Sequence, residues 1–179
     1  MSTLTLHDLT AGKVISPFTQ LRRLLTDVPG GHERPIELTI GEPREAMPGF
    51  IVAKLDEAAK LYGKYPPIRG SDELKAAISA WLSRRYAIAG GVDPASGILA
   101  LNGSREGLFF ACFPAVGRKQ VKGKPAILMC NPYYSAYLAG ALGVGAEPVF
   151  LNATAETGFL PDLDEIARDA ELMARTVAL

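Results

Sequence analysis

A glycine and a serine follow a short apolar run and open a predicted helix in Leu99-Ala-Leu-Asn-Gly-Ser-Arg-Glu-Gly-Leu108. The first N–H groups of a helix have no acceptor within the helix, and they lie at the positive end of its dipole. Gly103 has no Cβ to keep an anion away from the backbone, and the hydroxyl of Ser104 adds a donor. The turn therefore has the composition of a phosphate site. Serine also caps helices and glycine also forms tight turns, so a purely structural role is the alternative.

Tyrosines are concentrated in Asn131-Pro-Tyr-Tyr-Ser-Ala-Tyr137, directly after an apolar run at 126–130. In open α/β sheets, ligands bind at the edge formed by the carboxyl ends of the strands. A tyrosine ring at that edge could stack on a flat ligand, or it could pack on a neighbouring element. An anion-binding turn and an aromatic surface on adjacent loops together suit a phosphorylated planar cofactor.

Alternating strands and helices are predicted to position these residues. The units are 98–101 with 104–113, 126–130 with 133–142, and 147–151 with 162–174, before a last strand at 176–179. This order predicts an α/β fold with a largely parallel sheet. A chain that stops as a new unit begins is expected to be the N-terminal portion of a longer protein.

The first hundred residues are predicted to contribute three helices, a short strand and a rigid loop. The helices are expected at 17–26, at 50–62, and from a cap at Ser71 to about Arg85, with Trp81 in the core. The strand is expected at 36–40, and two prolines force an extended loop at 65–70.

Composition favours a small-molecule partner. The 179 residues carry 19 basic and 19 acidic side chains, so no overall charge attracts nucleic acid or an anionic membrane. Cys112 and Cys130 lie in apolar surroundings and are expected to be buried free thiols, as in a reducing cytoplasm. The sequence has neither a signal peptide nor a run of about eighteen apolar residues, so we expect a soluble cytoplasmic protein. No metal site is predicted.

Four blocks resemble, in their order and spacing, the class I and II pyridoxal-phosphate aminotransferases of fold type I. The blocks are Leu38-Thr-Ile-Gly-Glu-Pro43, Tyr65-Pro-Pro-Ile-Arg-Gly70, Leu101-Asn-Gly-Ser-Arg-Glu-Gly107 and Asn131-Pro-Tyr-Tyr134. The resemblance covers nearly the whole chain. It implies an N-terminal arm over residues 1–35, followed over 36–179 by the first part of the large cofactor-binding domain. That domain is an α/β structure, with a mainly parallel sheet flanked by helices, and it is incomplete at the C-terminus.

The resemblance also implies roles for individual residues. Gly41 would lie beside the substrate carboxylate. Tyr65 would reach the cofactor phosphate of a neighbouring subunit, which implies a homodimer. Tyr134 would stack on the pyridine ring of pyridoxal phosphate. Three consecutive residues would donate to the phosphate of their own subunit, namely Gly103, Ser104 and Arg105.

Three further segments resemble, more narrowly, the succinyldiaminopimelate aminotransferases of bacterial lysine biosynthesis. They are Gly63-Lys-Tyr-Pro-Pro-Ile-Arg-Gly-Ser71, Glu147-Pro-Val-Phe-Leu-Asn152 and Gly158-Phe-Leu-Pro-Asp162. The implied reaction moves an amino group between an amino acid and a 2-oxo acid, here N-succinyl-LL-diaminopimelate and 2-oxoglutarate.

The chain departs from the family in its catalytic residues. The family's catalytic lysine lies in a Ser-x-x-Lys motif, and none of the eight lysines here has a serine three residues before it. The Asn-Pro-x-Gly loop, the aspartate that pairs with the pyridine nitrogen and the arginine that binds the substrate carboxylate are also missing. We therefore expect the 179 residues alone to be inactive.

Two alternatives to this reading stay open. One is a non-catalytic module that binds a phosphorylated ligand or a partner, and the other is a lyase or decarboxylase of the same fold. Arg44 and Arg69 would either bind substrate carboxylates or form structural ion pairs.

Overall fold

The computed structural model describes residues 4–34, 36 and 38–179. The chain separates into two compact units, which are described in turn: Met1–Gly31 with Asn102–Leu179, and His32–Leu101. The division at residue 35 between an arm and a cofactor domain stays a prediction. Within the described ranges, every helix is too short or too polar to cross a membrane.

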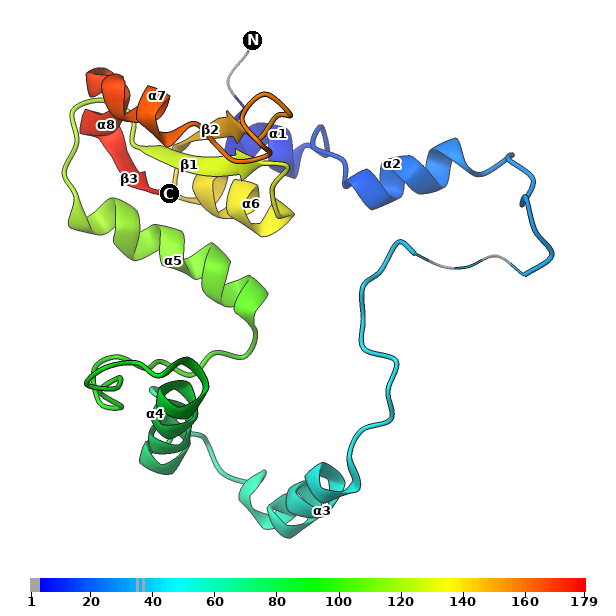
Figure 1. Ribbon diagram of the computed structural model, residues 1–179, viewed down its shortest axis with the longest axis vertical. Coiled ribbons are helices and arrows are strands. Elements are labelled where there is room, and N and C mark those ends of the chain that lie inside the picture. Colours follow the sequence, from blue (N-terminus) through cyan, green and yellow to red (C-terminus); the bar gives the residue numbers. More distant parts are fainter. Residues whose placement is uncertain (1–3, 35, 37) are drawn as a thin grey trace. The chain divides into compact units, whose positions relative to one another are not determined.

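A three-stranded parallel sheet forms the centre of the first unit (Figure 1). Its strands are β1 (Ala126–Asn131), β2 (Glu147–Asn152) and β3 (Thr176–Ala178), in the order β2-β1-β3. The register of β1 and β2 runs from Ala126 opposite Glu147 to Asn131 opposite Asn152. The predicted α/β fold with a parallel sheet is confirmed.

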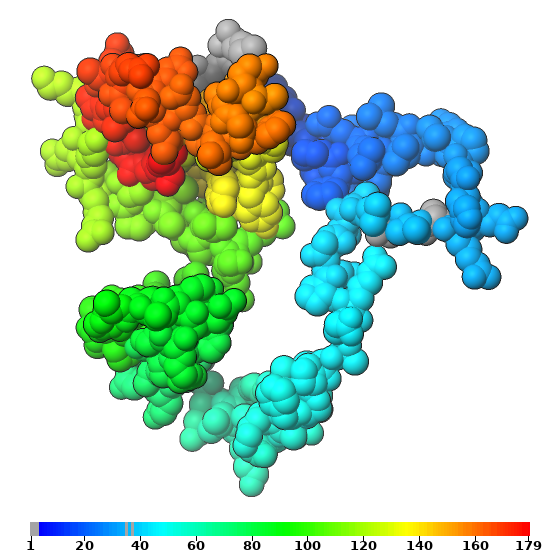
Figure 2. All heavy atoms as spheres, in the orientation of Figure 1, coloured from blue at the N-terminus to red at the C-terminus, as the bar shows by residue number. Residues whose placement is uncertain are grey.

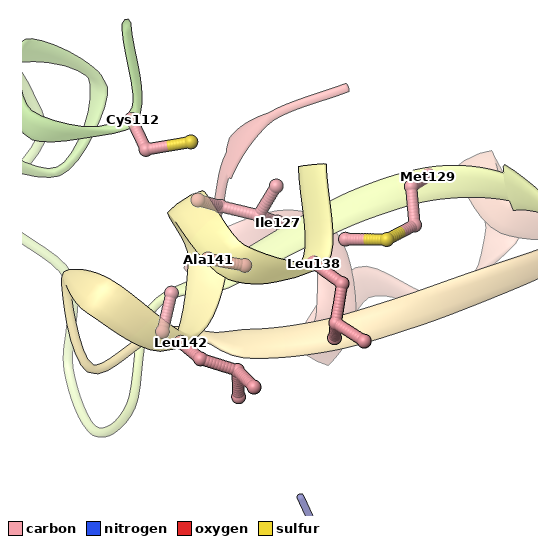
Figure 3. Close-up of a cluster of buried hydrophobic side chains, with 7 residues drawn as sticks. Cys112, Ile127, Met129, Leu138, Ala141 and Leu142 are labelled. Atoms are coloured by element: carbon pink, nitrogen blue, oxygen red, sulfur yellow. The ribbon is translucent and has the colours of Figure 1, made fainter. Parts of the chain in front are cut away.

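Helices cover both faces of this sheet because β1 is apolar on both sides (Figure 1). Ile127 and Met129 point to one face and pack with buried residues of α5 (Ser104–Arg118) and α6 (Ser135–Gly143), as Figure 3 shows. Ala126 and Leu128 point to the other face, where α7 (Leu163–Arg168) and α8 (Ala170–Arg175) add apolar side chains. Figure 2 shows the atoms of α7, α8 and β3 gathered together in orange and red.

The N-terminal residues also pack on the α5–α6 face. Helix α1 (Leu6–Thr10) begins at Thr5, whose side chain accepts from the N–H of Asp8 while Asp8 bonds back to Thr5. Leu9 and Val14 then pack against the buried cluster of Figure 3. Helix α2 (Pro17–Leu24) follows, with proline at its first position as predicted.

Two predicted helix boundaries in this unit are wrong. Helix α5 continues through Pro114 to Arg118 instead of ending at 113. Proline removes one helical hydrogen bond, but the packing of α5 on α6 keeps the helix continuous. The single helix expected at 162–174 is instead α7 and α8, because the Asp169 carboxylate accepts from the N–H of Leu172 and starts a new helix.

The second unit contains α3 (Gly49–Glu57), a short 3₁₀ helix at Ala59–Leu61 and α4 (Asp72–Tyr86). The predicted cap is present, since the Ser71 hydroxyl accepts from the N–H of Leu74 at 3.2 Å. Helix α4 and the loop after it form one cluster of atoms, green in Figure 2, in which the Ser79 hydroxyl donates to the carbonyl of Val92.

Several expectations for side chains and strands fail. Trp81 is 49% exposed, with its ring against Tyr86, rather than in the core. Cys130 is exposed because it lies where the buried part of β1 ends, whereas Cys112 is buried as predicted. Residues 98–101 form no strand, since no described strand pairs with them. The strand expected at 36–40 includes Glu37, which lies outside the described residues, and its described neighbours are not in a strand.

Candidate functional site

The turn before α5 offers backbone donors. Gly103 is the N-cap in an extended conformation, and its carbonyl accepts the first helical hydrogen bond from the N–H of Gly107 at 3.1 Å. The N–H groups of the three residues between them precede that bond, so they have no acceptor inside the helix. Because α5 is fifteen residues long, its dipole adds to the attraction for an anion.

A carboxylate lies at the same turn. A Cβ added to Gly103 would come within 2.7 Å of Glu106 Oε2, so the Glu106 side chain folds back over the N-cap. An acidic side chain in the first helical turn is stabilised by the same N–H groups and the same dipole that bind anions. A ligand phosphate here would therefore share the helix end with Glu106. Sequence reasoning missed this residue, although a glutamate three residues after an N-cap is a known helix-start signal.

The structure brings the third and fourth sequence blocks together through their side chains. The Arg105 guanidinium lies 6.0 Å from the centre of the Tyr134 ring. Tyr134 is the N-cap residue of α6, is 46% exposed, and meets the Tyr137 ring edge to face at 5.9 Å. A cation and an aromatic ring at this separation attract each other. The predicted phosphate turn and the predicted stacking ring are therefore neighbours, while their roles toward a cofactor stay predictions.

The carboxyl ends of β1 and β2 support this region. Asn131 at the end of β1 donates a hydrogen bond from Nδ2 to Oδ1 of Asn152 at the end of β2, at 2.8 Å. The centroids of the Tyr133 and Phe150 rings lie 5.1 Å apart. The peptide bond between Asn131 and Pro132 is cis. These contacts tie the Asn-Pro-Tyr-Tyr segment to both strands.

Gly41 and Tyr65 belong to the second unit, whereas the other four predicted site residues belong to the first. The Tyr65 side chain is fully exposed, and apart from the chain neighbours of Gly41 no atom of the described residues lies within 4 Å of the position of a Cβ on Gly41. Their roles stay predictions. Arg69 is in the same unit, and its guanidinium Nη2 donates to the carbonyl oxygen of Ala95 at 3.4 Å.

A cavity of about 950 Å³ adjoins the Arg105–Tyr134 pair within the first unit. Arg105 and Glu106 line it together with Phe110 and Tyr133, and the N-terminal segment contributes residues that include Lys13 and Ile15. Neither Gly103, Ser104 nor Tyr134 lines it. Sequence reasoning missed Lys13, Ile15 and Phe110, because only the packing of the N-terminal segment onto the buried cluster brings Lys13 and Ile15 to the same cavity as Phe110 of α5.

Comparison with known proteins identifies the family. The model of the class I and II aminotransferases matches residues 33–176, which is most of the chain. The chain belongs to that family. The resemblance stated from the four sequence blocks is thereby confirmed, and the family is pyridoxal-phosphate dependent.

Individual relatives agree with this assignment. The LL-diaminopimelate aminotransferase of Syntrophobacter fumaroxidans is 31% identical over 92% of this chain, and that of Aquifex aeolicus is 32% identical over 79%. A crystal structure of an aminotransferase from Neisseria meningitidis matches 96% of this chain with a TM-score of 0.80 and 34% identity. The aminotransferase AspB of Helicobacter pylori matches 86% with a TM-score of 0.76 and 29% identity.

These matches cover less than half of each relative. This aminotransferase-family chain spans 42% of the Syntrophobacter fumaroxidans protein, 35% of the Aquifex aeolicus protein and 42% of the Neisseria meningitidis structure. The similarity is therefore to one part of each of these larger proteins.

Proposed function

We propose that the protein containing these residues is a pyridoxal-phosphate-dependent aminotransferase, and that this chain supplies the phosphate-binding and ring-stacking part of its cofactor site. The observation that carries the proposal is the approach of Arg105 to Tyr134, in a chain that belongs to this family. It joins an anion-binding helix start to an exposed aromatic ring, and a phosphorylated planar cofactor needs both.

The residues of the chain suit the cofactor. Ser104 and Arg105 bring backbone N–H groups and side-chain donors to the start of α5, where a phosphate is stabilised. The Tyr134 ring would restrict the orientation of the pyridine ring by stacking on it. When bound, pyridoxal phosphate supplies an electron sink for bond cleavage at the α-carbon of an amino acid.

Diaminopimelate chemistry is the proposed substrate class. Two of the relatives are named LL-diaminopimelate aminotransferase, which supports LL-diaminopimelate as the amino compound. The N-succinyl derivative and 2-oxoglutarate as its partner rest on the sequence resemblance alone. The segments that resemble succinyldiaminopimelate aminotransferases favour the N-succinyl compound. Product analysis with each compound separates the two.

We also propose a homodimer in which Tyr65 serves the neighbouring subunit. Two successive prolines stiffen the loop after Tyr65, and its fully exposed side chain is available to another chain. Gly41 would lie beside the substrate carboxylate, where the open space at its Cα leaves room for a ligand. Hybrid dimers test the crossing, by mixing Tyr65→Phe subunits with subunits that lack the catalytic lysine.

Cofactor binding to the protein encoded by the full gene tests the central proposal. Ser104→Ala is expected to weaken pyridoxal-phosphate binding by about 0.5–2 kcal/mol, since it removes one donor to a charged group. The change is read from the cofactor absorbance during titration. Ser83→Ala on α4 serves as the matched control. Equal affinity in the wild type and Ser104→Ala would contradict the assignment of this turn.

A further inference from the structure

We propose that Asn102 is a site of spontaneous deamidation, a modification that places a negative charge at the turn before α5 and weakens cofactor binding there. Asn102 precedes Gly103, and the backbone nitrogen that follows an asparagine can attack the side-chain amide of that asparagine. Glycine offers the least hindered nitrogen, because it has no Cβ. The modification itself goes beyond the proposed function, while its effect on the cofactor rests on that function.

The reaction needs only water as a co-reactant. The N–H of Gly103 loses its proton to base in the solvent, and its nitrogen forms a bond to the side-chain carbonyl carbon of Asn102. The bond from that carbon to the side-chain nitrogen breaks, and this nitrogen takes up a proton and leaves as ammonia. Water then opens the cyclic imide at either of its carbonyls, which gives aspartate or isoaspartate. No atom is oxidised or reduced.

The chain has three asparagines, and two of them are protected from this reaction. Asn131 is followed by Pro132, whose nitrogen carries no proton. The N–H after Asn152 belongs to Ala153, and it donates to the carbonyl oxygen of Asn131 at 3.0 Å. The Asn152 side chain is also bonded, since its Oδ1 accepts from Nδ2 of Asn131 at 2.8 Å. Attack at Asn152 would therefore break hydrogen bonds at the end of the sheet.

Asn102 has neither kind of protection. It is exposed and lies in a bend outside the helices and strands. Among the described residues, neither its side chain nor the N–H of Gly103 has a hydrogen-bond partner. Rotation about the backbone bonds of Asn102, which brings the side-chain carbonyl carbon to the nitrogen of Gly103, therefore breaks no such bond.

Helix α5 favours the reactive form of the nitrogen. Gly103 is the N-cap of this fifteen-residue helix. The nitrogen that becomes negatively charged therefore lies at the positive end of the helix dipole, which stabilises the charge.

The product changes the charge of the turn. A Cβ on Gly103 would come within 2.7 Å of Glu106 Oε2, so one carboxylate already lies at this N-cap. Conversion of Asn102 adds a second carboxylate next to it, and both repel a phosphate at the same helix start. Isoaspartate also adds a methylene group to the main chain directly before the N-cap.

Peptide mass mapping tests the modification on the protein encoded by the full gene. The protein is incubated without cofactor in mildly alkaline buffer and then digested with trypsin, and an unincubated sample corrects for conversion during digestion. Asn102 is released in Tyr86–Arg105, and the other two asparagines in Gly123–Arg168, so each sample contains its own control. Asn102 is expected to convert at least about tenfold faster than either of the others, which corresponds to a barrier lower by ~1.4 kcal/mol. Isoaspartyl methyltransferase identifies the isoaspartate product.

Pyridoxal-phosphate titration tests the consequence. Asn102→Asp, which reproduces one product, is expected to bind roughly tenfold more weakly because of the added like charge. Gln120→Glu adds the same charge beyond the other end of α5 and should bind as the wild type does. Asn102→Gln should keep its affinity during incubation, while the wild type loses affinity as Asn102 converts. The incubated wild type also decides the matter if Asn102→Asp does not fold.

The outcomes separate this inference from the proposed function. Conversion of Asn102 no faster than that of Asn152 overturns the inference and leaves the proposed function untouched. Equal affinities of Asn102→Asp and Gln120→Glu overturn the effect on the cofactor. A wild type that does not bind pyridoxal phosphate overturns the proposed function, and the conversion of Asn102 is still measured in that case.

Discussion

At the scale of single residues, the close approach of α5 and α6 depends on two glycines. Gly140 lies against Cys112 and Phe109, and Gly143 lies against the ring of Phe109. Side chains at these positions would occupy the space that α5 now fills. Helix α5 follows the Gly103 turn and helix α6 begins at Tyr134. The two helices can therefore lie this close together only because the residues at 140 and 143 are small.

Gly140→Ala is therefore expected to destabilise the protein by about 1–3 kcal/mol, the usual cost of overpacking. The new Cβ would lie 2.6 Å from the Cys112 sulfur and 3.2 Å from the backbone oxygen of Phe109. Gly117→Ala on α5 is the control, because apart from its chain neighbours and the nearby backbone of its own helix, no atom of the described residues lies within 4 Å of its Cβ position. That change should be neutral or stabilise the helix by up to about 1 kcal/mol. Urea denaturation of both variants measures the difference, and equal free energies of unfolding would contradict the packing.

The two cysteines are expected to differ in reactivity. Burial raises the pKa of the Cys112 thiol, and its sulfur donates to the carbonyl of Leu108 at 3.7 Å, whereas Cys130 is exposed. Only the thiolate reacts with alkylating reagents. Iodoacetamide at pH 8 should therefore label Cys130 in the folded chain and Cys112 only after unfolding. Peptide mass mapping identifies the site, and rapid labelling of Cys112 in the folded Cys130→Ser variant would refute this.

At the scale of elements, helix starts were the most predictable feature. Ser71 was expected to cap α4, and it does so with Asp72 and Glu73 in the first turn and Arg84 and Arg85 in the last. These signals are local, because a cap needs only a side chain and N–H groups two or three residues away. Where a helix ends was less predictable, as the continuation of α5 through Pro114 shows.

The start of α1 makes a prediction about pH. Hydrogen bonds from Lys13 and Thr5 lower the pKa of Asp8 from 3.8 to about 2. A carboxyl group whose pKa is lowered by folding stabilises the folded state above its unfolded pKa, and this contribution fades as the pH falls towards 2. Lys13→Met should raise the pKa of Asp8 towards 3.8, because the main cause of the shift is removed.

Carboxyl-carbon NMR during a pH titration measures this pKa directly. Lys13→Arg keeps a cation at the same position and should leave most of the shift in place. The melting temperatures of the wild type and Lys13→Met should differ more at pH 6 than at pH 2. An unchanged pKa of Asp8 in Lys13→Met would show that the pair is not formed in solution.

At the scale of the whole molecule, residues 1–179 expressed alone are expected not to transfer amino groups. None of the eight lysines lies in a Ser-x-x-Lys motif, so no residue of these 179 is placed to attach the cofactor covalently or to carry the substrate proton. Amino transfer to 2-oxoglutarate is the assay, and borohydride reduction followed by peptide mapping detects a lysine-bound cofactor. The protein from the full gene is the positive control. One lysine labelled stoichiometrically in the 179 residues would overturn this prediction.

The α/β class, the parallel order of strands and the family followed from the sequence. The alternation of apolar runs with amphipathic segments is a local pattern, which can be recognised from residues close together in the sequence. The glycine and serine before α5 and the tyrosines after β1 are local patterns as well. Their types and spacing indicated a phosphorylated planar cofactor before any contact was known.

Only the tertiary structure decided which of these residues meet. The approach of Arg105 to Tyr134 and the cavity lined by Ile15 and Phe110 both depend on segments far apart in the sequence. Such contacts are set by the packing of both faces of β1 and by the fit of α5 against Gly140. A sequence pattern specifies which side of an element is apolar, but the partner of that side is chosen by shape and burial in the folded chain.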